Sequence, residues 1–403
     1  MFGALREGAP LAFDAGRCLR LRSRYSACEA CARACPAGVL CVSDTAVTLA
    51  QEGCLHCGRC AAACPAGALQ VEGFPRSEAA LEARAGLPLY LDCWKVPASC
   101  SPAGALRVPC LAGLGLHEIL RLHAEGRALV ALDRGWCARC RAGCGQEHAA
   151  LETIESARAL LEALGVPERA LPRLERQPLL PERMARGPIE ALAERRLSRR
   201  DFVASLLREG IQAAAPPLPQ PVSPPPRPGL FSDAPRAQLT ALARAIAARH
   251  GREAPAELYP ELRVSSGCRN HQVCAAICPS GALTGYETGD GTAGLVFDAA
   301  ACIACGECAR ACPEGALTVL PHRAAGAAPA APETLTRWGV RECDECGREF
   351  AAHGEQTLCL SCCKTRDLAR QGFHQLFGAA RAEGRSARGG ERRTEHVNGE
   401  ERA

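Results

Sequence analysis

The apolar residues of segment 87–180 follow strand-like and helix-like spacings in turn. Short apolar runs predict strands, and apolar residues three or four positions apart predict helices. The predicted strands are Leu89–Leu91, Ala105–Val108 and Ala128–Leu132, and the predicted helices are His117–His123 and Ala149–Leu164. We therefore expect a central α/β domain over 87–180.

The polar and proline-rich segments that follow indicate connections rather than further core. Residues 188–213 have the apolar spacing of an amphipathic helix. Residues 215–235 contain the run APPLPQPVSPPPRPG, which is typical of a polyproline linker. Residues 380–403 are charged and lack aromatic side chains, so we expect a disordered tail.

A repeat gives the clearest division of the chain. The sequence Cys-Pro-x-Gly-x-Leu begins at Cys35, Cys64, Cys278 and Cys312. The four copies form two pairs, and the pairs predict two similar modules, at 14–74 and 236–322.

Cysteine content then decides the chemistry. The chain has 27 cysteines in 403 residues but only 4% aromatic residues, so small modules held together by metal are expected. Segment 1–16 carries charges and no apolar signal region, which argues against secretion and disulfides. No apolar stretch is long enough to span a bilayer. We expect a cytoplasmic protein with thiolate ligands and no membrane partner.

The net charge argues against a nucleic-acid partner. The formal charge is +4 with cysteines counted as neutral. Metal-bound cysteines are thiolates, so loading these cysteines with metal would bring the net charge to about −8. The apparent basicity disappears in the loaded protein.

Two runs have the complete spacing Cys-x2-Cys-x2-Cys-x3-Cys-Pro, at Cys54–Cys64 and Cys302–Cys312. Three cysteines two residues apart lie on one tight loop, so their thiolates reach three corners of one cube. The fourth begins the next helix and points to the neighbouring cube. Proline suits that first helical turn because its missing N–H would have no partner there.

These runs resemble dicluster bacterial-type ferredoxins. The resemblance implies a βαββαβ-like fold with two [4Fe–4S] cubes per module and crossed ligation. One cube would take Cys35, Cys54, Cys57 and Cys60, and another would take Cys278, Cys302, Cys305 and Cys308.

The two partner runs each lack one cysteine. In the first module, Cys28, Cys31 and Cys64 need a fourth ligand, for which we favour Cys18 over Cys41. In the second, His271 stands between Cys268 and Cys274, with Cys312 as the crossed ligand. A His-ligated cube, a [3Fe–4S] cluster and a non-protein ligand remain open, and so does a bystander His271.

The central domain carries a third kind of cysteine set. We expect ligands at Cys93, Cys110, Cys137 and either Cys140 or Cys144, because cysteines after adjacent parallel strands meet at one sheet edge. The order of elements resembles the delta subunit of methyl-viologen-reducing hydrogenase. That resemblance implies a [2Fe–2S] cluster and heterodisulfide-reductase-type partners. A zinc site and idle thiols are the alternatives.

The C-terminal segment 337–378 has two Cys-x2-Cys knuckles separated by twelve residues. They are Cys343/Cys346 and Cys359/Cys362, with Cys363 as a spare. Four thiolates on two knuckles are typical of a structural, zinc-ribbon-like zinc site.

The chain is therefore expected to be an α+β multidomain protein with two dicluster modules, a central α/β cysteine domain and a small zinc-binding domain. The predicted function is electron transfer through several [4Fe–4S] clusters, as a subunit or partner of a larger oxidoreductase. Heterodisulfide-reductase-like, hydrogenase-like and formate-dehydrogenase-like complexes are the candidate partners. The alternatives are a catalytic reductase subunit acting at the atypical cluster and a redox-sensing or maturation factor.

Overall fold

The structure is a computed structural model that describes residues 11–75, 88–179, 231–324, 328–329, 331–352 and 354–378. Two compact units divide the chain, Met1–Gly339 and Val340–Ala403. The predicted helix at 188–213, most of the predicted linker at 215–235 and the predicted tail at 380–403 lie outside the described residues.

The first cysteine-rich module is built from very short elements. Strand β1 (Leu11–Phe13) pairs antiparallel with β4 (Leu69–Val71), and β2 (Leu40–Val42) pairs with β3 (Val47–Leu49). The helices are α1 (Leu19–Arg22), α2 (Ala30–Arg33) and α3 (Arg59–Ala62). A single helical turn is not stable in isolation. The stability of these helices must therefore come from their contacts with the rest of the module.

The second module has the element order strand, helix, strand, strand, helix, strand. These elements are β9 (Glu261–Val264), α9 (Val273–Ala276), β10 (Leu283–Thr288), β11 (Thr292–Phe297), α10 (Glu307–Ala311) and β12 (Leu317–Leu320). Strand β9 pairs with β12, and β10 forms a hairpin with β11. The order agrees with the expected βαββαβ pattern. Strand β13 (Glu333–Glu342) extends the hairpin by pairing with β11.

The central domain contains a four-stranded parallel sheet in the order β6-β5-β7-β8. The strands are β5 (Leu89–Cys93), β6 (Leu106–Val108), β7 (Leu129–Asp133) and β8 (Arg173–Arg176), and the helices are α4 (Leu116–Ala124) and α5 (Leu151–Ala163). The three predicted strands and two predicted helices are confirmed within a few residues. Strand β8 was not predicted, because its sequence RLER has a single apolar residue.

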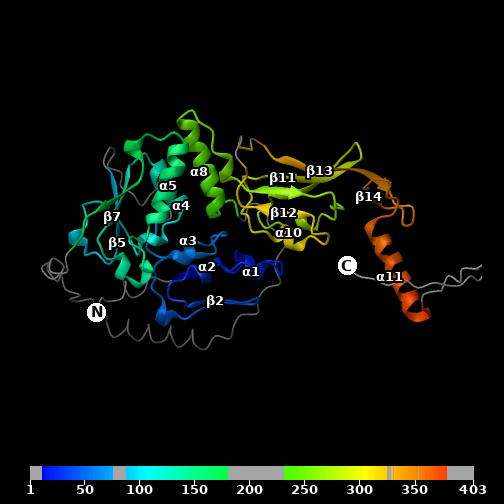
Figure 1. The fold of residues 1–403 in the computed structure, drawn as a ribbon, viewed down its shortest axis with the longest axis horizontal. Helices are drawn as coiled ribbons and strands as arrows, with labels where there is room; N and C mark the ends of the chain where they lie inside the picture. Colours follow the sequence, from blue (N-terminus) through cyan, green and yellow to red (C-terminus); the bar gives the residue numbers. More distant parts are fainter. Residues whose placement is uncertain are drawn as a thin grey trace, which may run out of the picture. The chain divides into compact units, whose positions relative to one another are not determined.

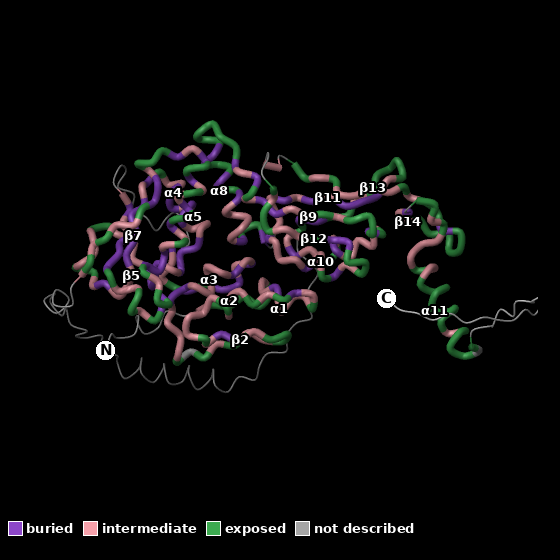
Figure 2. Tube along the Cα trace, in the orientation of Figure 1, coloured by how far each residue is buried: buried purple, intermediate pink, exposed green. Residues whose placement is uncertain are grey.

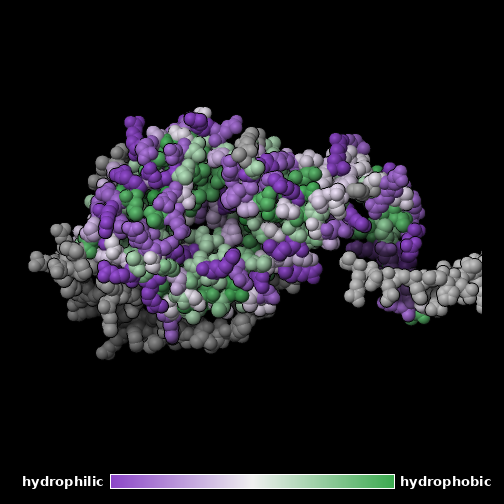
Figure 3. Space-filling view, viewed as in Figure 1, coloured by the Kyte–Doolittle hydropathy of each residue, from purple (hydrophilic) through white to green (hydrophobic). Residues whose placement is uncertain are grey.

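One hydrophobic core continues from the central domain into the second module. Helix α8 (Pro235–Arg249) lies beside α4 (Figure 1), and its buried Ile246 belongs to the same cluster as Leu120 of α4 and Leu283 of β10. Buried residues are concentrated in the strands and helices of this core (Figure 2). On the face in view, hydrophilic residues cover much of the surface, with smaller hydrophobic areas between them (Figure 3).

The second unit, from Val340, contains the end of β13, strand β14 (Glu349–Ala352), which pairs with β13, and helix α11 (Leu360–Phe377). Three large apolar side chains of α11 are exposed, namely Leu368, Phe373 and Leu376. Across the described ranges, none of the helices combines the length and the apolar character that crossing a bilayer requires.

Candidate iron–sulfur and metal sites

Every Cys-Pro-x-Gly repeat folds into the same kind of turn. The glycine of each copy has a left-handed φ between 58° and 69°, at Gly38, Gly67, Gly281 and Gly315. Glycine adopts this conformation at no steric cost. In two copies the turn directs the same later backbone N–H at the cysteine, in the bonds from Ala68 to Cys64 Sγ (3.2 Å) and from Ala316 to Cys312 Sγ (3.3 Å). In these copies the repeat provides the cysteine sulfur with its own amide donor.

Eight cysteines of the first module line two cavities. The Cys54 site comprises Cys35, Cys54, Cys57 and Cys60. The Cys28 site comprises Cys18, Cys28, Cys31 and Cys64. Each site receives one Cys-Pro cysteine from the other run, which is the crossed arrangement. Cys41 is exposed on β2 and is not among the lining residues of either cavity.

The second module has the same crossed arrangement. In the Cys302 site, Cys278 lies close enough to interact electrostatically with Cys302, Cys305 and Cys308. In the His271 site, Cys268, His271, Cys274 and Cys312 line one cavity. The His271 side chain is only 7% exposed, and its Nε2 lies 3.0 Å from Glu314 Oε1. The imidazole is therefore oriented by a carboxylate, as ligating histidines commonly are.

The loop that carries His271 has the backbone of a complete run. In both complete runs, the residues just before and just after the second cysteine have positive φ, as in Ala304 (54°) and Gly306 (72°). In the incomplete run, Asn270 (50°) and Gln272 (55°) have positive φ on either side of His271. His271 thus occupies the position of the second ligand. Non-glycine residues in this conformation are costly and mark functional sites.

Burial raises the pKa of at least one thiol at each of these four sites, and nearby cysteines add to the effect. The pKa rises to about 11 at Cys31, Cys274 and Cys302 and to about 12 at Cys60 and Cys308. Buried thiolates need a compensating cation. Buried polar atoms at two of the cavities, His56 Nδ1 and both amide atoms of Asn270, also lack a partner among the described residues. The donor sets and the cavities fit iron–sulfur clusters.

The central domain brings together four of its candidate ligands. Cys93, Cys110, Cys137 and Cys140 line the central site, a cavity at the carboxyl edge of the parallel sheet. Cys144 is exposed and is not among the lining residues. Burial raises the pKa of Cys93 to about 11 and of Cys110 to about 12.

Cys140 behaves differently because of Lys95. The Lys95 ammonium donates a hydrogen bond to Cys140 Sγ over 3.0 Å. Burial acts to raise the pKa of Cys140, but the Lys95 bond and backbone N–H donors outweigh it, so the pKa falls below its usual value. The central site therefore holds one thiol that ionises readily.

A buried ion pair supports the strand that ends at Cys93. Arg134 NH2 lies 2.7 Å from Asp92 Oδ2, with side-chain exposures of 7% and 1%. The same guanidinium donates to the Cys100 carbonyl over 3.2 Å, and Ser101 Oγ donates to Asp92 Oδ2. Cys100 thus takes part in a structural network through its backbone.

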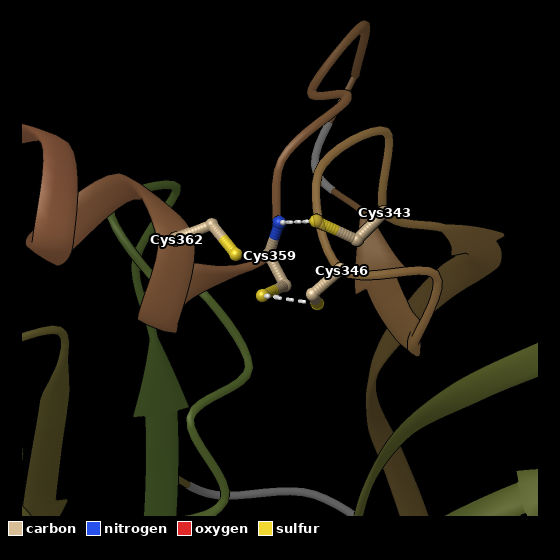
Figure 4. Close-up of side chains that lie close together, drawn as sticks. All are labelled: Cys343, Cys346, Cys359 and Cys362. Carbon is tan, nitrogen blue, oxygen red and sulfur yellow. Dashed lines mark hydrogen bonds between the residues drawn. The ribbon is translucent and has the colours of Figure 1, made fainter.

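The second unit contains the tightest cysteine set (Figure 4). The sulfur atoms of Cys343, Cys346, Cys359 and Cys362 all lie within 4.8 Å of one another, and Cys346 Sγ lies 3.7 Å from Cys359 Sγ. Bonds of about 2.3 Å to one tetrahedral ion place sulfur atoms about 3.8 Å apart. The Cys359 N–H donates to Cys343 Sγ over 3.2 Å and, as the largest of several causes, lowers the pKa of Cys343 to about 6. This geometry fits a single metal ion.

Comparison with known proteins identifies two ferredoxin-type domains. Residues 265–316 match the 4Fe-4S dicluster domain, and residues 47–70 match the 4Fe-4S binding domain. The first range contains all the candidate ligands of the second module, and the second contains Cys54, Cys57, Cys60 and Cys64. No curated protein matches the chain. Domains that bind 4Fe-4S clusters point to iron–sulfur electron transfer.

Sequence reasoning missed the residues that orient or connect these sites. For Lys95 and Glu314 the sequence offered one weak indication of a role at a site, namely that each charged residue lies two positions after a candidate ligand. Gly113 and Phe74, which lie against the Cys54 loop, gave none, because their contacts come from segments far apart in the chain.

Proposed function

We propose that this protein transfers electrons through four cubane-type clusters and one further cluster, as a subunit or partner of a larger oxidoreductase. The observation that carries the proposal is the crossed arrangement. In each module, the Cys-Pro cysteine of each run lies in the site formed by the other run. An iron–sulfur cluster, once bound, gains and loses single electrons without gaining or losing atoms.

The proposed ligands follow the four sites of the modules. The complete runs supply Cys54, Cys57, Cys60 and Cys302, Cys305, Cys308, with Cys35 and Cys278 as the crossed ligands. The Cys28 site uses Cys18, Cys28, Cys31 and Cys64. The His271 site uses Cys268, Cys274 and Cys312, with His271 as the fourth ligand. The burial of His271 and its bond to Glu314 support that assignment over a bystander role.

The two remaining cysteine sets have different proposed contents. We assign a [2Fe–2S] cluster to Cys93, Cys110, Cys137 and Cys140, supported by their common cavity and by the Lys95–Cys140 bond. We assign a structural zinc ion to Cys343, Cys346, Cys359 and Cys362, supported by the short sulfur–sulfur distances. Four thiolates leave tetrahedral zinc no open position, so this zinc would stabilise the fold.

The proposed partners are redox proteins of hydrogenase-like, heterodisulfide-reductase-like or formate-dehydrogenase-like complexes, with no role for nucleic acid or a membrane. All 27 cysteines are free of disulfides. Free thiols in such number suit a reducing compartment, which supports the cytoplasm as the location.

Anaerobic purification with iron, sulfide and zinc analysis tests this function. We expect roughly 14–18 irons and about one zinc per chain. Stepwise reduction followed by EPR should resolve several one-electron centres. A reconstituted, folded protein with fewer than about eight irons would refute the two-module proposal, because two complete runs alone require that many.

A further inference from the structure

The two complete runs each place one residue against the next metal site along the molecule. This residue stands between the glycine and the third cysteine, and it is Arg59 in the first run and Glu307 in the second. The two residues have opposite charges, yet both leave their own loop and bond to a segment that carries other candidate ligands.

Arg59 reaches the turn of the central site. Its Nε donates to the Ala142 carbonyl over 3.0 Å, and its NH2 donates to Gln146 Oε1 over 2.8 Å. Both acceptors belong to the segment that directly follows Cys140. The first module is therefore bonded to the wall of the central cavity.

Two glycines bring the backbones at this junction into direct contact. A Cβ added at Gly113 would lie 2.5 Å from the Cys57 carbonyl oxygen, and one at Gly58 would lie 3.1 Å from the Cα of Gly113. Gly113 is three residues after Cys110, and Cys57 interacts electrostatically with Cys110. The Cys54 site and the central site are therefore immediate neighbours.

Glu307 forms the second junction. Its buried side chain faces the Ser23 and Ser26 side chains of the first module. Close by, Arg310 donates from Nε to the Tyr25 carbonyl and from NH2 to the Cys305 carbonyl, the latter over 2.7 Å. Ile303, beside Cys302, is buried in one cluster with Leu19 and Cys64, against which Cys305 also packs. The Cys302 site therefore adjoins the Cys28 site.

We propose that Arg59 and Glu307 dock each complete run onto the next site, so that the five sites form one unbranched series. Its order is central site, Cys54 site, Cys28 site, Cys302 site and His271 site. The inference rests on the proposed function and adds that the first module is the middle of the series. The central site and the His271 site are then the ends at which outside redox partners exchange electrons.

The third cysteines of the two complete runs, Cys60 and Cys308, offer a matched test in the full-length, dithionite-reduced protein. Cys60→Ala and Cys308→Ala each remove one site, which iron analysis verifies as a loss of about four irons. The readout is the magnetic broadening of the central-site EPR signal by its neighbour. We expect Cys60→Ala to abolish this broadening and Cys308→Ala to leave it unchanged.

The docking residues are tested in the same way. Arg59→Met and Glu307→Leu should keep the wild-type iron content. Arg59→Met should reduce the broadening of the central-site EPR signal by the Cys54 site, and Glu307→Leu should reduce the magnetic broadening between the signals of the Cys302 and Cys28 sites. Equal broadening of the central signal in Cys60→Ala and Cys308→Ala would overturn the series, as would zinc in the central site. Loss of the proposed function itself would look different, because iron would be missing from the modules of the wild-type protein.

Discussion

Lys95 Nζ lies 3.0 Å from Cys140 Sγ in the central cavity, so a positive charge directly contacts one of the candidate thiolate ligands. Lys95 follows Cys93 by two residues, at the end of strand β5, whereas Cys140 belongs to the turn after β7. The parallel sheet brings the two segments together. A positive charge at this distance stabilises the thiolate and any reduced cluster bound to it.

Replacing Lys95 should therefore change both properties. We expect Lys95→Met to raise the pKa of Cys140 and to lower the reduction potential of the bound cluster by tens of millivolts, because one positive charge is lost. Alkylation of Cys140 followed by mass spectrometry measures the first effect, and EPR-monitored titration measures the second. Lys95→Arg, which keeps the charge, is the control. An unchanged potential in Lys95→Met would show that the bond has no electrostatic role.

Gly143 should be required for the central site. A Cβ at this position would lie 2.0 Å from the Cys137 carbonyl oxygen. The three nearest atoms all belong to the Cys137 backbone, so the clash cannot be relieved by moving a flexible side chain. We expect Gly143→Ala to lose the central cluster, about two irons, while the clusters of both modules remain. Gly289→Ala is the matched control, because nothing lies within 4 Å of the added Cβ. Wild-type iron content in Gly143→Ala would contradict the assignment.

His271 should act as a ligand that can be exchanged for thiolate. His271→Cys completes the run, so we expect the same iron content and a lower potential, since a negative charge is added. His271→Ala should lose about one iron by leaving a three-iron cluster. His322→Ala, at an exposed histidine outside the cysteine sites, should change neither. If the wild-type protein already holds a three-iron cluster here, the ligand role is wrong.

Metal affinity of the Cys343 set should weaken as the pH falls. Thiols must lose protons to bind metal, so each thiol that is protonated in the free site adds one released proton to the binding reaction. The pKa of Cys343 is lowered to about 6, so this thiol is already ionised at pH 7 and adds a proton only below about pH 6. We therefore expect zinc affinity to fall more steeply below that pH.

Competition with a chromophoric chelator between pH 5 and 8 measures this dependence. Cys343→Ser should lose the ion, whereas Cys363→Ser should retain it, because Cys363 is not in the close-packed set. If Cys343→Ser retained zinc and Cys363→Ser lost it, Cys363 and not Cys343 would be the ligand.

The ferredoxin runs were predictable because their chemistry is local. Cysteines two residues apart share one loop, and the following Cys-Pro-x-Gly turn is set by residues that are adjacent in sequence. The parallel strands were also predictable, since the apolar residues 129–132 of β7 are all buried. Strand β8 was not predicted because it has no apolar run. Its pairing with β7 holds it in the sheet.

The choice among alternative ligands needed the fold. The sequence favoured Cys18 over Cys41 without excluding Cys41, and it left the choice between Cys140 and Cys144 open. Packing places Cys18 and Cys140 at cavities and leaves Cys41 and Cys144 exposed. Whether these cysteines bind clusters stays a prediction for metal analysis.

By itself, the sequence predicted the kinds of sites and most of their cysteines, because spacing within a loop fixes which thiolates can converge. Only the tertiary structure decided which sites are neighbours, through Gly113 against Cys57 and Arg310 against Tyr25. Such contacts join residues tens to hundreds of positions apart, and they arise from the packing of whole modules. No periodic pattern in the sequence predicts these contacts.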